Sequence, residues 1–121
     1  MSGEVSFDRP AGATVEKEFS GSVAAAADRV FADLMTFVDP GADAHFVTDR
    51  NTRRAVVQGD YWYRGEYLVE EVDGGSSNLG YTIVNVAPGW HVLGRLTGRK
   101  ELRAAPRQFE DLLQRLGDQP A

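Results

Sequence analysis

Three tyrosines in one short stretch are the residues of this chain best suited by type and spacing to hold a ligand. Tyr61, Tyr63 and Tyr67 are separated by even numbers of positions, so on a β-strand they share one face. Aromatic walls grip apolar molecules, while hydroxyls bond their polar ends. The alternative is an ordinary packed core. The predicted ligand-binding set is Tyr61, Tyr63, Tyr67, Tyr81, Trp90 and Phe109.

Acid–base chemistry has two histidine candidates. His45 and His91 are far apart in the chain, and neither has an acidic partner at a spacing typical of metal ligands. No serine or cysteine near them suggests a nucleophile. A neutral imidazole accepts a proton near pH 7, so His45 is the candidate general base if it lines a cavity. We predict no metal site and no cofactor.

Positive charge gathers in one stretch of an acidic chain. Between positions 95 and 107, five basic residues stand against one glutamate, while the whole chain carries a net charge of −5. The acidic remainder argues against a nucleic-acid-binding domain. The basic stretch is either a solvated helix face or a contact for a phosphate, carboxylate or acidic partner. The anion-contact candidates are Arg95, Arg99 and Arg103.

The composition is that of one folded domain. The chain has 121 residues, of which 42% are hydrophobic and 26% charged, close to globular averages. It contains no cysteine, which removes disulfides and thiolate chemistry. No signal-like or membrane-spanning apolar run occurs, so we expect a cytoplasmic protein. The predicted organisation is a flexible leader (1–13), one α+β domain (14–117) and a tail (118–121).

The first half of the domain predicts a strand followed by a helix. Apolar and polar residues alternate over 14–19, which indicates a strand. Gly21 and Ser22 then interrupt the alternation, and Ser22 is a suitable N-cap. The apolar spacing of three and four residues predicts a helix from Val23 to Phe37. The weakly patterned residues 42–52 are left as a loop or a short strand.

Three β-like runs follow in close succession, at 53–58, 61–72 and 78–86, and their glycine-rich links predict an antiparallel meander. In the middle run the tyrosines share a face with Gly65, which suits strand bending or close approach. Arg64 falls on the opposite face among glutamates, where we expect exposed surface charge.

The C-terminal part is amphipathic. Apolar spacing predicts a helix over 106–116 that ends at Gly117. Pro106 either kinks a longer helix beginning at Trp90 or separates two shorter elements. The structure of residues 87–105 is therefore left open.

The order of strand, helix, antiparallel meander and C-terminal helix resembles the START-like superfamily of helix-grip proteins, which includes Bet v 1-like proteins and polyketide cyclases. Three segments carry this resemblance, at 15–34, 74–81 and 88–116. It implies an antiparallel sheet wrapped around the C-terminal helix, with a ligand cavity between them. The span 42–86 has room for roughly four strands rather than the family's six or so. Either the sheet is truncated, which implies a smaller cavity, or part of 90–102 is a further strand.

The resemblance implies a binder of a small hydrophobic, lipid-like or aromatic ligand, and it transfers no catalytic residue. One alternative is a cyclase- or dehydrase-like enzyme that uses a cavity histidine or tyrosine as acid or base. Another is a protein-interaction domain without a cavity, in which Trp62 and Leu68 form a contact patch. We expect a monomer or a homodimer, with no nucleic acid and no membrane span.

Overall fold

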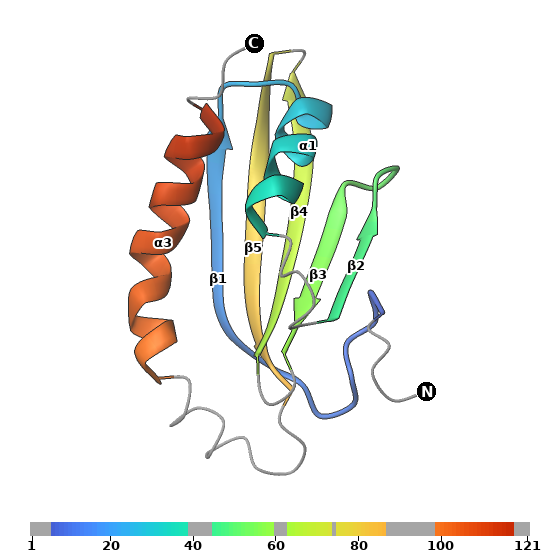
Figure 1. Cartoon of the computed structure of the whole chain (residues 1–121), viewed down its shortest axis with the longest axis vertical. Helices are drawn as coiled ribbons and strands as arrows, with labels where there is room; N and C mark the ends of the chain where they lie inside the picture. Colours follow the sequence, from blue (N-terminus) through green and yellow to red (C-terminus); the bar gives the residue numbers. More distant parts are fainter. Residues whose placement is uncertain (1–5, 39–44, 60–62, 74, 87–98, 118–121) are drawn as a thin grey trace.

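The computed structural model describes residues 6–38, 45–59, 63–73, 75–86 and 99–117. Over these ranges the chain forms an α+β fold in which two helices pack on one face of a five-stranded antiparallel sheet (Figure 1). This confirms the predicted class. The elements are β1 (Thr14–Val23), α1 (Ala27–Val38), β2 (His45–Asp49), β3 (Arg54–Gln58), β4 (Tyr63–Asp73), β5 (Ser76–Asn85) and α3 (Arg99–Gly117).

The sheet is a four-stranded meander extended by the first strand. The strand order is β1-β5-β4-β3-β2, so the first strand of the chain pairs with the last one. The described chain after α1 thus holds four strands, as its length predicts. β2 lies within the stretch that the sequence left open. Tyr67 of β4 lies between Ala55 of β3 and Tyr81 of β5, which places all three on one face.

The helix α1 begins at Ala27 and not at Val23, so the predicted start is wrong. The strand β1 continues through Gly21 and Ser22, and Ser22 is therefore not an N-cap. Val23 is buried and pairs with Ser77 of β5. A β-branched side chain packs well on such a half-buried strand, and this contact overrides the local helix signal. Gly21 lies under α3, where an added Cβ would come within 2.3 Å of a leucine methyl group.

The two helices bury the stripes that their spacing predicts. In α1 the buried residues are Ala27, Val30, Phe31 and Leu34. The helix α3 begins at Arg99, ahead of the predicted 106–116, and ends at Gly117 as expected. It runs through Pro106, on whose two sides Ala105 and Phe109 are buried against the sheet. That packing offsets the backbone hydrogen bond that proline cannot donate.

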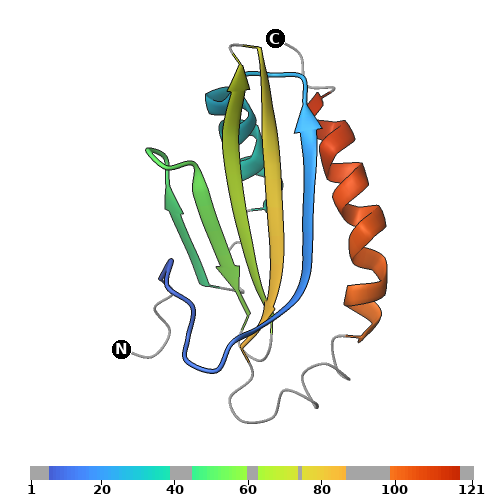
Figure 2. The same ribbon diagram turned by 180° about the vertical axis from the view of Figure 1, so that it is seen from behind.

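The sheet also buries residues on the face opposite to the helices. Figure 2 shows the chain before β1 crossing this outer face, on which no described helix lies. Residues 6–9 belong to the segment predicted as a flexible leader, and they make specific contacts there. No described helix is both long and apolar enough to span a membrane.

Candidate functional site

Three tyrosines gather on the helix-facing side of the sheet. The hydroxyl oxygens of Tyr63 and Tyr81 are hydrogen-bonded, 2.5 Å apart. The rings of Tyr67 and Tyr81 are stacked, with centroids 4.6 Å apart. The shared face of Tyr63 and Tyr67 is thereby confirmed, whereas Tyr61 lies outside the described residues. We refer to Tyr63, Tyr67 and Tyr81 as the tyrosine cluster.

Gly65 makes room for this cluster. A Cβ atom placed on Gly65 would lie 2.2 Å from the hydroxyl oxygen of Tyr63, so the phenol end of Tyr63 occupies the space that a side chain would take. The sequence marks Gly65 as a place for bending or close approach. The structure identifies what approaches, which is an aromatic ring two residues away on the same strand.

The electrostatics of the tyrosine cluster favour the protonated form. Burial is the main cause that raises the pKa of Tyr63, Tyr67 and Tyr81 well above the ordinary tyrosine value. All three hydroxyls therefore carry their protons near neutral pH. They can donate hydrogen bonds to a ligand, but they are poor general bases.

Two phenylalanines fill the space in front of Tyr81. The ring of Phe109 on α3 lies 6.1 Å from the ring of Tyr81 and 5.4 Å from that of Phe19 on β1, measured between centroids. These stacked rings are core packing, worth about 0.5–1.5 kcal/mol per pair beyond the area they bury. Phe109 thus belongs to the packed wall and not to an open pocket.

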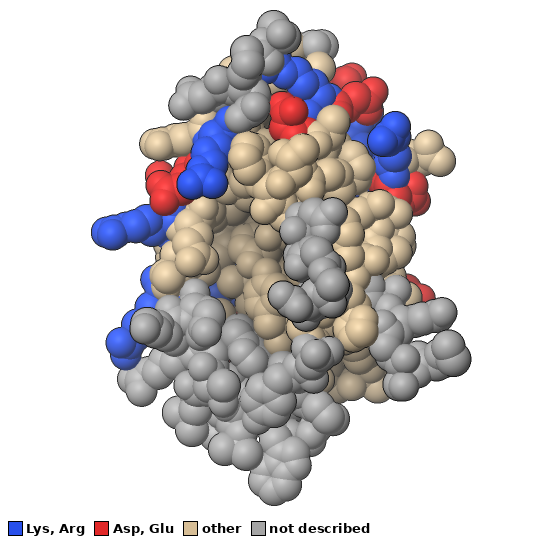
Figure 3. Space-filling model, viewed as in Figure 1, with Lys and Arg blue, Asp and Glu red and all other residues tan. Residues whose placement is uncertain are grey.

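An open groove remains beside Tyr67, between the end of α1 and the middle of α3. Its volume is about 260 Å³. In the space-filling view, the surface between the two helices is hollowed and lined mainly by uncharged residues (Figure 3). The lining residues are Phe37, Val38, Tyr67, Gln108, Asp111, Leu112 and Arg115. We call this space the Tyr67 groove. Of the predicted ligand-binding residues that the structure describes, Tyr67 alone lines it.

A larger hollow lies elsewhere, between α1 and the β2–β3 turn, with a volume of about 480 Å³. It is lined by Asp28, Phe31, Ala32, Arg50 and Asn51. Phe31 is its one aromatic residue and is itself buried in the core. This hollow does not reach the tyrosine cluster, whereas the Tyr67 groove contains a predicted ligand-binding residue and is the candidate site for that reason.

The other predicted site residues lie apart from the Tyr67 groove. Phe46 packs against the helix-side core, so its neighbour His45 lies on the outer face of β2. His45 is thus not placed to act as a base on a ligand of the groove. Arg103 is exposed on α3 and borders a separate surface hollow. Trp90, Arg95 and the Arg99 side chain lie outside the described residues, and the anion contact stays a prediction.

Arg64 corrects the expectation of exposed surface charge, because its exposed fraction is 0%. Its guanidinium donates hydrogen bonds to Glu66 at 2.8 Å, to Gln58 at 3.1 Å and to the backbone carbonyl of Phe7 at 3.0 Å. The error arises because residues 6–9 lie over this part of the sheet. The available signal was Phe7 itself, an aromatic residue in a stretch read as a leader.

Among the described residues, no group of three or more histidine or acidic side chains is placed to hold a metal ion. No protein-family model matches the chain, and no curated protein matches its sequence.

Proposed function

We propose that this protein binds a small hydrophobic or aromatic molecule in the Tyr67 groove. One observation carries the proposal, namely that an open groove between α1 and α3 reaches a ring of the buried tyrosine cluster. The order of the elements, which resembles that of START-like helix-grip proteins, supports it, because ligands of that superfamily lie between the sheet and the C-terminal helix.

The dimensions of the groove limit the ligand. A volume of about 260 Å³ is smaller than that of sites for drug-sized molecules, about 300–1,000 Å³. A single ring, two fused rings or a short acyl chain would fit. Phe37, Val38 and Leu112 supply apolar contacts, and the protonated cluster behind Tyr67 suits a ligand with a hydroxyl or carbonyl at its buried end.

A titration of the full-length protein with 2-naphthol tests the proposal. This probe has two apolar rings and one hydroxyl, which match the walls and floor of the groove. We expect saturable changes in the amide chemical shifts of Tyr67 and Leu112, with a dissociation constant between about 10 µM and 1 mM for so small a ligand.

A matched pair of variants on α3 locates the binding site. Gln108 lines the groove and Gln114 does not, although both are exposed on the same helix. Gln108→Trp should fill the groove and weaken binding by about tenfold or more, whereas Gln114→Trp should leave the affinity unchanged. Equal affinities in the two variants, or no saturable shift in the unaltered protein, would contradict the proposal. Thermal unfolding checks that both variants fold.

A further inference from the structure

The outer face of the sheet holds a second small core, separate from the Tyr67 groove. Val56 and Val84 are 2% and 0% exposed, although their cross-strand partners Glu66 and Arg64 place them opposite to the helices. Burial on a face without a described helix requires another cover. Residues 6–9, which we call the arm, supply part of it (Figure 2).

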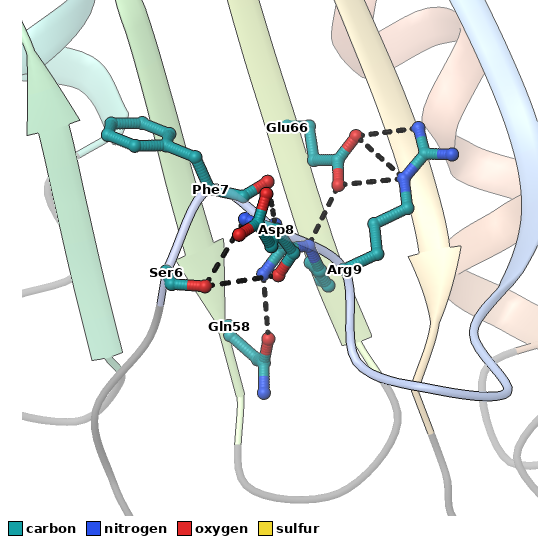
Figure 4. Close-up of polar contacts among 7 residues, drawn as sticks. Ser6, Phe7, Asp8, Arg9, Gln58 and Glu66 are labelled. Atoms are coloured by element: carbon teal, nitrogen blue, oxygen red, sulfur yellow. Dashed lines mark hydrogen bonds and ion pairs between the residues drawn. The ribbon is translucent and has the colours of Figure 1, made fainter.

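The arm is held in the way that a bound peptide is held (Figure 4). The ring of Phe7 lies under the guanidinium of Arg54, with 4.6 Å between the guanidinium carbon and the ring centroid. The backbone carbonyl of Phe7 accepts a hydrogen bond from the buried Arg64. Arg9 makes a forked contact with the Glu66 carboxylate through three hydrogen bonds of 2.8–3.2 Å. A forked guanidinium–carboxylate contact is geometrically selective.

These contacts define what the outer face recognises. They require a short bent segment that carries an aromatic residue, a free backbone carbonyl, and an arginine two positions further on. None of them depends on the covalent link between the arm and β1. That link is an exposed turn in which the Ala13 amide donates to the Pro10 carbonyl and Gly12 has φ 82°. Opening the turn would free the arm without changing the face beneath it.

We propose that the outer face is a binding site for such a segment, and that the arm of a second copy of this chain occupies it by reciprocal exchange. The chain carries both halves of the contact, since the arm supplies Phe7 and Arg9 while the face supplies Arg54 and Glu66. Two copies can therefore satisfy each other through one two-fold interface. The arm of the same chain competes with the arm of a second copy, at an effective concentration of about 1 mM. The exchanged fraction therefore rises as the protein concentration approaches that value.

A charge swap between full-length variants tests the exchange. In Arg9→Glu the arm and its own face both carry a glutamate, and in Glu66→Arg both carry an arginine. Mixing the two variants makes both contacts between the chains complementary. At about 100 µM of each, near a tenth of the effective concentration, light scattering after gel filtration should show at least about fivefold more dimer in the mixture than in either variant alone.

The matched control restores the contact within one chain. The double variant Arg9→Glu/Glu66→Arg should remain as monomeric as the unaltered protein at the same concentration. A mixture with no more dimer than its components would overturn the proposal. Dimer of equal amount in one variant alone would also overturn it, because that dimer would use another surface.

A second measurement leaves Glu66 in place, because Glu66→Arg sets a second guanidinium beside the buried Arg64. A photoreactive benzoylphenylalanine replaces Phe7 in the otherwise unaltered full-length chain. Illumination should yield crosslinks to β3 or β4, and the share between chains should rise about tenfold when the protein concentration is raised tenfold within the dilute regime. Crosslinks within single chains only, at every concentration, would overturn the exchange.

Discussion

The two faces of β4 bury polar groups in opposite ways. On the helix-facing side, the hydroxyls of Tyr63 and Tyr81 are hydrogen-bonded to each other without any charge. On the outer side, Arg64 is satisfied by the carboxylate of Glu66, by an amide oxygen and by a backbone carbonyl. One strand thus separates a neutral network from an ionic one. The comparison shows that alternation along a strand sorts the kind of polar interaction as well as polar from apolar residues.

This difference determines which conditions perturb each face. A network of neutral hydroxyls has no net charge to screen, so salt should affect it little. The ion pairs of the outer face depend on ionic strength, and a buried charge that loses its partner is costly. Variants on the two faces should therefore respond differently to salt and to pH.

The largest effect should come from the neutral face. Phe109→Ala removes a buried ring that stacks on Phe19 and Tyr81, and we expect a loss of about 3–5 kcal/mol in the free energy of unfolding. Urea unfolding measures it. The loss should be the same at low and high salt. Gln114→Ala on the exposed side of α3 serves as the control, with a change of about 0.5 kcal/mol or less. A strong salt dependence for Phe109→Ala would break the comparison.

A smaller effect is expected on the ionic face. Glu66→Gln leaves the Arg64 side chain, which is 1% exposed, without the carboxylate that it contacts. Because Glu66 itself is partly exposed, we expect a loss of about 2–3 kcal/mol, below that for a fully buried pair. Raising the salt concentration should reduce the difference in the free energy of unfolding between Glu66→Gln and the unaltered protein.

A second ion pair provides the control for Glu66→Gln. Asp28 pairs with Arg53, but the Asp28 side chain is 84% exposed. Asp28→Asn should therefore change the free energy of unfolding by no more than about 1 kcal/mol. If Glu66→Gln cost no more than Asp28→Asn, the outer face would not contain an ionic core.

The smallest effects concern pH. The ionic face should lose its contribution to folding stability in acid, and the neutral face should lose its contribution in base. Partial burial acts to raise the pKa of Glu66, but hydrogen bonds from Arg9 and Arg64 outweigh it, so this pKa lies below its ordinary value of 4.5. The stabilisation is present above that value and is lost as pH falls through the lowered pKa. Urea unfolding below pH 4.5 should show a shallower loss for Glu66→Gln than for the unaltered protein.

The pH dependence of stability for the tyrosine cluster has the opposite sign to that for Glu66. Burial raises the pKa of Tyr63 above its ordinary value of 10.0, so its stabilisation is present below that value and is lost at higher pH. Absorbance at about 295 nm, which reports tyrosinate, should rise together with unfolding in base. Tyrosinate formation in the cluster while the protein stays folded would contradict the buried, mutually bonded arrangement.

Much of the helix-facing side could be predicted from the sequence. Strands repeat every two residues and helices every 3.6, so local spacing identified the shared face of Tyr63 and Tyr67 and the buried stripe of α1. Local patterns could not show that Val23 would be held in a strand by Ser77 of β5. They also could not show the burial of Arg64, because that depends on a contact with Phe7, 57 positions earlier.

The site itself was predicted only in part. Tyr67 was recognised because aromatic residues on a common face suggest a pocket wall. Gln108, Asp111 and Arg115 were not, since polar residues on an amphipathic helix normally mark its solvent side, and here they form the rim of a groove. The position of His45 depended on the phase of a five-residue strand that the pattern did not resolve.

The alternation within β4 assigns odd-numbered residues to one face of the sheet and even-numbered residues to the other, a property that we call parity. Residues 63, 65 and 67 serve the neutral face, while 64 and 66 serve the ionic face, so a slip of one residue against β3 and β5 would misplace both sets at once. Guanidinium and carboxylate would then meet the aromatic core, and phenol rings would meet the arm. An insertion of one residue should therefore be expelled as a bulge, whereas an insertion of two would preserve parity. The register of β4 is therefore fixed independently by the contacts on each face of the sheet.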